Sequence, residues 1–129
     1  MAETVTTQLP VVGKTCTAVT IGRPRLDPLN DSIKFAFDDG TSMVLRHEQD
    51  CCETVTIESI SGDFAHLYGV PLLVAEKRES TKRDEGWTFY CFRTVNGTVD
   101  IRWHGESEYY SIAVDHILYD KDGKEVNRG

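Results

Sequence analysis

A chain of 129 residues with 40% hydrophobic and 27% charged residues has the size and composition of one globular domain. No segment approaches the ~20 apolar residues that a membrane helix needs, and the N-terminus lacks the basic and apolar regions of a signal peptide. The formal net charge of −7 repels a phosphate backbone. We therefore expect one intracellular domain over residues 1–129, with residues 1–10 flexible and residues 120–129 a polar tail, and without membrane insertion or general nucleic-acid binding.

The first half of the chain predicts short strands joined by tight turns. Residues 16–21 have an extended pattern. Apolar and polar side chains alternate in residues 33–37, and the pair Asp39-Gly40 then predicts a turn. Residues 43–47 repeat the alternation, which indicates a β-hairpin. Residues 54–58 predict a further strand with one face toward solvent.

The middle of the chain predicts one short helix between two strands. Asp63 is a suitable N-cap for one or two helical turns that reach Tyr68, and Gly69 is a suitable stop. Residues 72–75 predict a buried strand. The segment from Ser80 to Gly86 is polar, so we expect a loop that is the most mobile part of the chain.

A second hairpin is predicted around Asn96-Gly97, with residues 87–94 and 98–104 as its strands. We expect a break at residues 105–107 and another strand from Tyr109 to Tyr119. The total is seven to eight short strands and one short helix, mostly in sequential hairpins. This pattern predicts a mainly β fold, or α+β with one short helix, built as a twisted antiparallel sheet or a partly closed barrel or sandwich.

The run from His47 to Glu53 holds potential metal ligands, acids and nucleophiles. Adjacent strand residues point to opposite faces, so Cys51 and Cys52 could not both reach one metal ion easily, and the chain has no Cys-x-x-Cys. We expect free thiols, no metal and no cofactor. A thiol- or zinc-dependent enzyme centred on His47, Cys51 and Cys52 is the alternative, but no known catalytic motif supports it, so we expect a protein without enzymatic activity.

The segment from Arg102 to Tyr110 carries the residue types that dominate protein interfaces. Successive residues of a strand face opposite sides, so Arg102 and His104 lie on the face opposite Trp103. Two interpretations follow: either Trp103 lies in the core while Arg102 forms a cross-strand ion pair, or the segment is a binding surface. The candidate partner-binding residues of the chain are Asp50, Cys52, Glu53, Arg102, His104, Glu106, Tyr109 and Tyr110.

Several separated motifs in one order resemble a small bacteriophage family known only as a domain of unknown function. They are Asp50-Cys51-Cys52-Glu53, residues 57–63, Pro71 with Ala75-Glu76, residues 87–90, and residues 101–107 with Tyr109-Tyr110. The resemblance implies a phage-encoded accessory protein in the host cytoplasm. It brings no activity and no catalytic residue with it.

These observations predict an accessory binding protein that sequesters or inhibits a host factor and acts as an anti-defence protein. The partner is expected to be a host protein or a small nucleotide-like ligand. In the second version Arg102, Tyr109 and Tyr110 of neighbouring copies would clasp the nucleotide, which predicts a homo-oligomer. A minor virion component is a further alternative.

Overall fold

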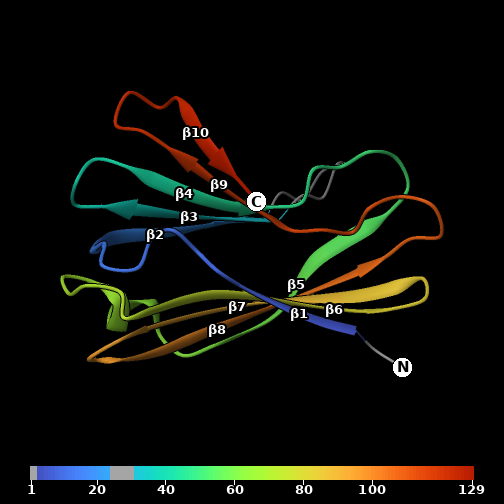
Figure 1. The fold of residues 1–129 in the computed structure, drawn as a ribbon, viewed down its shortest axis with the longest axis horizontal. Coiled ribbons are helices and arrows are strands. Elements are labelled where there is room, and N and C mark those ends of the chain that lie inside the picture. The colour runs from blue at the N-terminus through green and yellow to red at the C-terminus, as the bar shows by residue number, and fades with distance from the viewer. Residues whose placement is uncertain (1–2, 24–30) are drawn as a thin grey trace.

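The computed structural model describes residues 3–23 and 31–129, which form two antiparallel five-stranded sheets packed face to face (Figure 1). In spatial order the first sheet contains β1 (Glu3–Gln8), β6 (Val74–Lys82), β7 (Glu85–Thr94), β8 (Gly97–Glu106) and β5 (Thr54–Ser61). The second contains β10 (Glu125–Arg128), β9 (Asp115–Tyr119), β4 (Ser42–Arg46), β3 (Ser32–Phe37) and β2 (Cys16–Gly22). The mainly β, antiparallel prediction is confirmed, and the architecture is a sandwich rather than a barrel.

The core lies between the two sheets and comes from the apolar side of each alternating strand. The rings of Phe35 on β3 and Phe92 on β7 are 4.7 Å apart and join the opposing sheets. Trp103 on β8 is fully buried, as predicted by one interpretation of its parity. Burial of such large apolar side chains is the main favourable contribution to folding.

Both predicted hairpins are present. The chain turns between β3 and β4 at Asp39-Gly40, where Gly40 has φ +85°. It turns again between β7 and β8, where Thr94 pairs with Gly97. The predicted helical turn is a 3₁₀ helix, η1 (Phe64–Leu67), and the Asp63 carboxylate caps it by accepting from the Ala65 amide at 2.9 Å.

Ten strands are present in the described residues, more than the seven to eight that the pattern predicts. The additional strands lie at sheet edges. Residues 3–8, expected to be flexible, form β1 beside β6, and part of the expected polar tail forms β10 beside β9. Backbone pairing needs no apolar side chains, so the exposed polar residues of β10 left no hydrophobic alternation in the sequence.

Two boundaries differ from the predictions. The expected loop at residues 80–86 is instead a tight β6–β7 hairpin that turns at Arg83-Asp84. The residues at the end of β6 are exposed or half-buried, so no alternation marks the strand. The break expected at residues 105–107 comes later, because β8 continues to Glu106, and residues 107–114 form a loop before β9 begins at Asp115.

Candidate functional site

A cleft of about 870 Å³ opens at one end of the sandwich. Three segments meet there: the residues that precede β5, the β6–β7 turn, and the loop that leaves β8 (Figure 1). We call it the tyrosine cleft, and its lining residues are Cys52, Thr54, Lys82, Arg83, Asp84, Glu85, Glu106, Ser107, Glu108, Tyr109 and Tyr110. Four of the eight candidate binding residues are therefore brought together, namely Cys52, Glu106, Tyr109 and Tyr110.

The two tyrosines project from a loop that is anchored at both ends. Tyr109 is 89% exposed and Tyr110 is 44% exposed. At the start of the loop the Ser107 amide donates to the Asp84 carbonyl at 2.9 Å. At its end the buried Tyr90 hydroxyl donates to the Val114 carbonyl at 2.5 Å. These anchors restrict the loop, so the tyrosines are presented with less conformational freedom to lose on binding.

A pair of glycines under the loop provides the space in which it packs. Gly86 and Gly105 face each other across the β7–β8 ladder, and Ile112 lies over both of them. A Cβ atom at Gly105 would lie 2.7 Å from the Cβ atom of Ile112 and 3.2 Å from Val55. The absence of side chains at this pair therefore lets the loop lie against the sheet.

We expect Gly105→Ala to lower the free energy of unfolding by about 1–3 kcal/mol, because the added methyl group overpacks the contact with Ile112. Urea denaturation measures the loss. The double variant Gly105→Ala/Ile112→Gly is the control, since it removes the Cβ atom of residue 112 that the added methyl group would contact at 2.7 Å. It should be more stable than the sum of the two single losses predicts; strictly additive losses would contradict this account of the loop.

The Glu53 carboxylate organises the segment that precedes β5. It accepts from the Asp50 amide at 2.9 Å, from the Cys51 amide at 2.8 Å and lies 2.8 Å from His47 Nε2. Burial on its own would raise the pKa of Glu53, but these hydrogen bonds outweigh it and lower the pKa to about 2. Glu53 is thus turned inward, and its role in the structure is to hold the loop that carries Cys52.

His47 connects this segment to the tyrosine loop. Its ring is buried, with Nε2 facing Glu53 and Nδ1 lying 2.7 Å from the Ala113 carbonyl. One contact joins the ring to the segment before β5, and the other joins it to the loop that leaves β8. The buried His47 ring therefore links the segment before β5 to the loop that leaves β8, the two segments that border the cleft.

The structure contradicts the prediction of free thiols at one pair of cysteines and agrees with it at the other two. Cys51 and Cys52 are joined by a disulfide, whereas free thiols were predicted. The prediction was wrong here because these residues occupy a bend and not a strand, so alternation does not separate their side chains. Cys16 and Cys91 are free, as predicted, and burial raises the pKa of each to about 11, which makes both poor nucleophiles.

Two of the other candidates lie on the outer face of the first sheet. The Arg102 guanidinium is 5.9 Å from the Trp87 ring and 5.7 Å from the Phe89 ring, and it pairs with Glu58 on β5 at 3.6 Å. The predicted cross-strand ion pair is thus present. His104 Nε2 lies 2.7 Å from a Glu85 oxygen at the border of the cleft. Asp50 is exposed but does not line the cleft.

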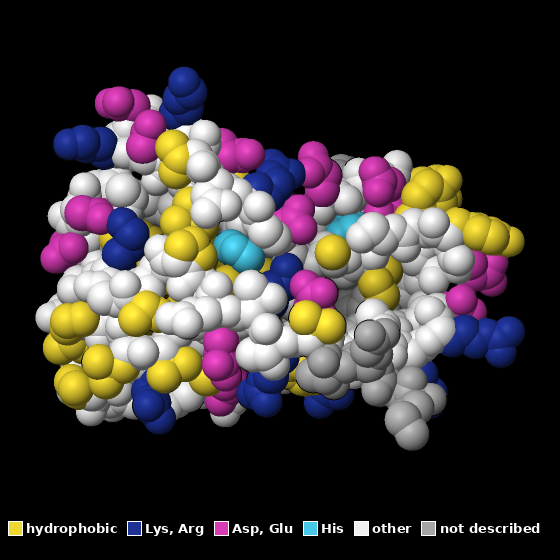
Figure 2. Space-filling model, viewed as in Figure 1, with side chains coloured by type: hydrophobic (Ala, Val, Ile, Leu, Met, Phe, Trp, Pro, Cys, Tyr) yellow, Lys and Arg dark blue, Asp and Glu magenta, His cyan; other side chains and the backbone are white. Residues whose placement is uncertain are grey.

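The turn from Lys82 to Glu85 belongs to the site and was not predicted. The sequence did contain a signal that places this turn near Glu106. The two-residue turn of the β7–β8 hairpin sets Thr94 opposite Gly97, and the same antiparallel register continues along both strands until Glu85 is opposite Glu106. Charges around the cleft are mixed, with two basic and four acidic lining side chains. Figure 2 likewise shows basic and acidic groups interspersed on one face, without a field of a single sign.

Fold and site together define a small β-sandwich with a loop-built cleft at one end. The chain belongs to the family described as Domain of unknown function (DUF7448), which matches residues 9–116. No curated protein and no solved structure matches the chain. Among the described residues, no helix has the length and apolar character needed to cross a membrane.

Proposed function

We propose that the protein is a phage-encoded accessory binding protein that sequesters or inhibits a host factor in the host cytoplasm, and that it binds this factor at the tyrosine cleft. The observation that carries the proposal is the 89% exposure of Tyr109 on an anchored loop. Tyrosine supplies a large contact area with few rotatable bonds, and it is enriched at interface hot spots. Tyr110 and the cleft beside it extend the same surface.

The charges at the cleft favour a protein partner over a nucleotide. Asp84, Glu85, Glu106 and Glu108 outnumber Lys82 and Arg83, so an anionic ligand would meet repulsion from most of the lining. Arg102, the cation expected to clasp a nucleotide, is on the outer sheet face and stacks on aromatic rings of its own chain. A segment of a host protein with exposed basic and apolar side chains fits this lining better.

The geometry gives less support to the enzyme alternative. A thiol enzyme would need a histidine nitrogen free to activate a cysteine. Both ring nitrogens of His47 are already used, one by Glu53 and one by the Ala113 carbonyl, and the sulfur atoms of Cys51 and Cys52 are bonded to each other. The prediction of a minor virion component stays a prediction, and detection of the protein in purified particles tests it.

We expect Tyr109→Ala to weaken partner binding by roughly 30-fold, the effect of losing about 2 kcal/mol at a hot spot. The protein, immobilised as bait, is incubated with host extract, and captured proteins are identified and quantified by mass spectrometry. Val95→Ala is the matched control, because Val95 is 73% exposed at the opposite end of the β7–β8 hairpin.

A partner retained by the wild type and by Val95→Ala, but lost with Tyr109→Ala at unchanged melting temperature, would support the proposal. If every captured protein binds the two variants equally, or if nothing is captured at micromolar bait, the cleft is not the binding site and the proposal fails.

A further inference from the structure

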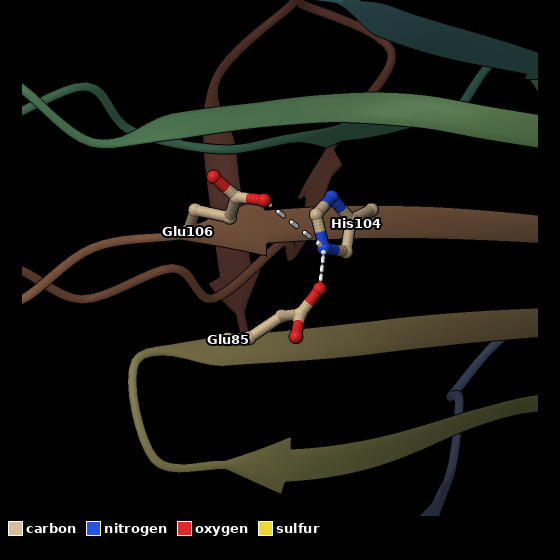
Figure 3. Close-up of side chains that lie close together, drawn as sticks. All are labelled: Glu85, His104 and Glu106. Carbon is tan, nitrogen blue, oxygen red and sulfur yellow. Dashed lines mark hydrogen bonds and ion pairs between the residues drawn. The ribbon is translucent and has the colours of Figure 1, made fainter.

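Three potential metal ligands converge on the border of the tyrosine cleft. Ligand atoms of Glu85, His104 and Glu106 all lie within 4.8 Å of one another. Nε2 of His104 is 2.7 Å from a Glu85 oxygen and 3.8 Å from a Glu106 oxygen (Figure 3). One imidazole nitrogen and two carboxylate oxygens thus point toward a common point between β7 and β8.

The strand register places two carboxylates of the cluster opposite each other. Glu85 and Glu106 are directly opposite in the β7–β8 ladder, and like charges in that position destabilise a sheet. On its other side Glu106 pairs with Thr54, which carries no charge. In the part of the chain that the structure describes, the ion pairs of these two glutamates are with His104. A bound cation would offset the repulsion that the register imposes.

The surroundings suit an ion that enters from solvent. The side chains of His104, Glu85 and Glu106 are 24%, 40% and 67% exposed, so all three are accessible. Packing of the Trp87 ring at 5.4 Å steadies the imidazole on β8. The two glutamates have flexible side chains that can draw in to the ~2.0–2.2 Å distances of metal ligation without movement of the strands.

We propose that Glu85, His104 and Glu106 bind a divalent transition-metal ion, Zn²⁺ or Mn²⁺, at the border of the tyrosine cleft. Imidazole and carboxylate are the ligand types that these ions accept. Three protein ligands leave coordination positions for water or for a donor atom from a molecule in the cleft. The inference rests on the side-chain cluster itself, so it can hold or fail independently of the host-factor proposal.

Isothermal titration of the purified protein with ZnCl₂ and separately with MnCl₂ tests the site. We expect one ion per chain for at least one of the two metals. Affinity should fall at least about tenfold in His104→Ala, Glu85→Gln and Glu106→Gln. The matched controls are His66→Ala, an exposed histidine at η1, and Asp122→Asn, an exposed acidic residue between β9 and β10 that does not line the cleft; both should bind as the wild type does.

Reduction of the Cys51–Cys52 disulfide would release two thiols that could compete for the metal, so the variant Cys51→Ser/Cys52→Ser is titrated in parallel. Retention of binding in this variant, with loss in His104→Ala, supports the proposal. Loss of binding with the cysteines, binding unchanged in all three cluster variants, or no saturable binding below about 1 mM of either metal would overturn it. If His104→Ala does not fold, the two charge-neutralising glutamine variants decide the outcome, since each retains the size of the side chain.

Discussion

Replacement of Trp103 by alanine is expected to lower the free energy of unfolding by about 3–5 kcal/mol, the usual cost of removing a large aromatic side chain from a core. Trp103 is fully buried within the hydrophobic cluster that joins the two sheets. Since a domain of this kind has a total stability of about 5–15 kcal/mol, the variant would lose a large fraction of it. Equilibrium unfolding in urea, followed by circular dichroism, measures the change.

Trp103→Phe provides the informative comparison. The indole Nε1 of Trp103 is buried and has no hydrogen-bond partner among the described residues. An unpaired buried donor costs about 1–3 kcal/mol, so phenylalanine loses packing volume but also removes an unfavourable group. We expect its loss to be well below that of alanine. Val95→Ala, at an exposed position, should stay within about 0.5 kcal/mol of the wild type. Equal losses of unfolding free energy in Trp103→Phe and Trp103→Ala would contradict the conclusion that the unpaired indole N–H is unfavourable.

Glu53→Gln is expected to give the second large effect, a melting temperature lower by several degrees at pH 7. The carboxylate accepts from two backbone amides and from His47, and an amide side chain cannot reproduce all of these contacts. The segment from His47 to Glu53 would loosen, and with it the position of Cys52 at the cleft. Melting curves recorded from pH 7 to pH 2 measure both the size and the pH dependence of the loss.

The sign of the pH dependence follows from the lowered pKa. Since the pKa of Glu53 is about 2 in the folded protein and near 4.5 when unperturbed, its contribution to stability is complete above about pH 4.5 and is lost as the pH falls toward 2. The difference between wild type and Glu53→Gln should therefore shrink over that range. Glu108→Gln, which changes an exposed carboxylate, is the control and should follow the wild type. A difference that is constant from pH 7 to pH 2 would contradict the assigned role.

Local patterns were enough to predict the centre of the fold. The alternation in β3, β4 and β8, together with Asp39-Gly40 and Asn96-Gly97, indicated both hairpins, and one of the two interpretations of residues 102–110 placed Trp103 in the core, where it lies. The edge strands β1 and β10 were beyond such patterns, because their stability comes from backbone pairing with neighbours distant in sequence. The pairing of Glu85 with Glu106 can be derived from the sequence, because the position of the Asn96-Gly97 turn fixes the register of the two strands.

The candidate site was predictable only in part. The aromatic and charged composition of residues 102–110 indicated Tyr109, Tyr110 and Glu106, which the structure gathers with Cys52 around one cleft. Composition could not distinguish Glu53, whose carboxylate turns inward to cap the amides of its own loop, from the exposed Asp50 nearby. That distinction depends on the bend at the cysteine pair, which no periodicity encodes.

The position of the loop at residues 107–114 has an evolutionary consequence. It crosses from one sheet to the other, and its ends are fixed by Asp84 and Tyr90, which belong to the scaffold. Residues 108–111 between those attachment points can change without disturbing either sheet, since all four are exposed. If the tyrosine cleft binds a partner as proposed, its specificity can therefore change among related sequences while the two sheets that support it stay the same.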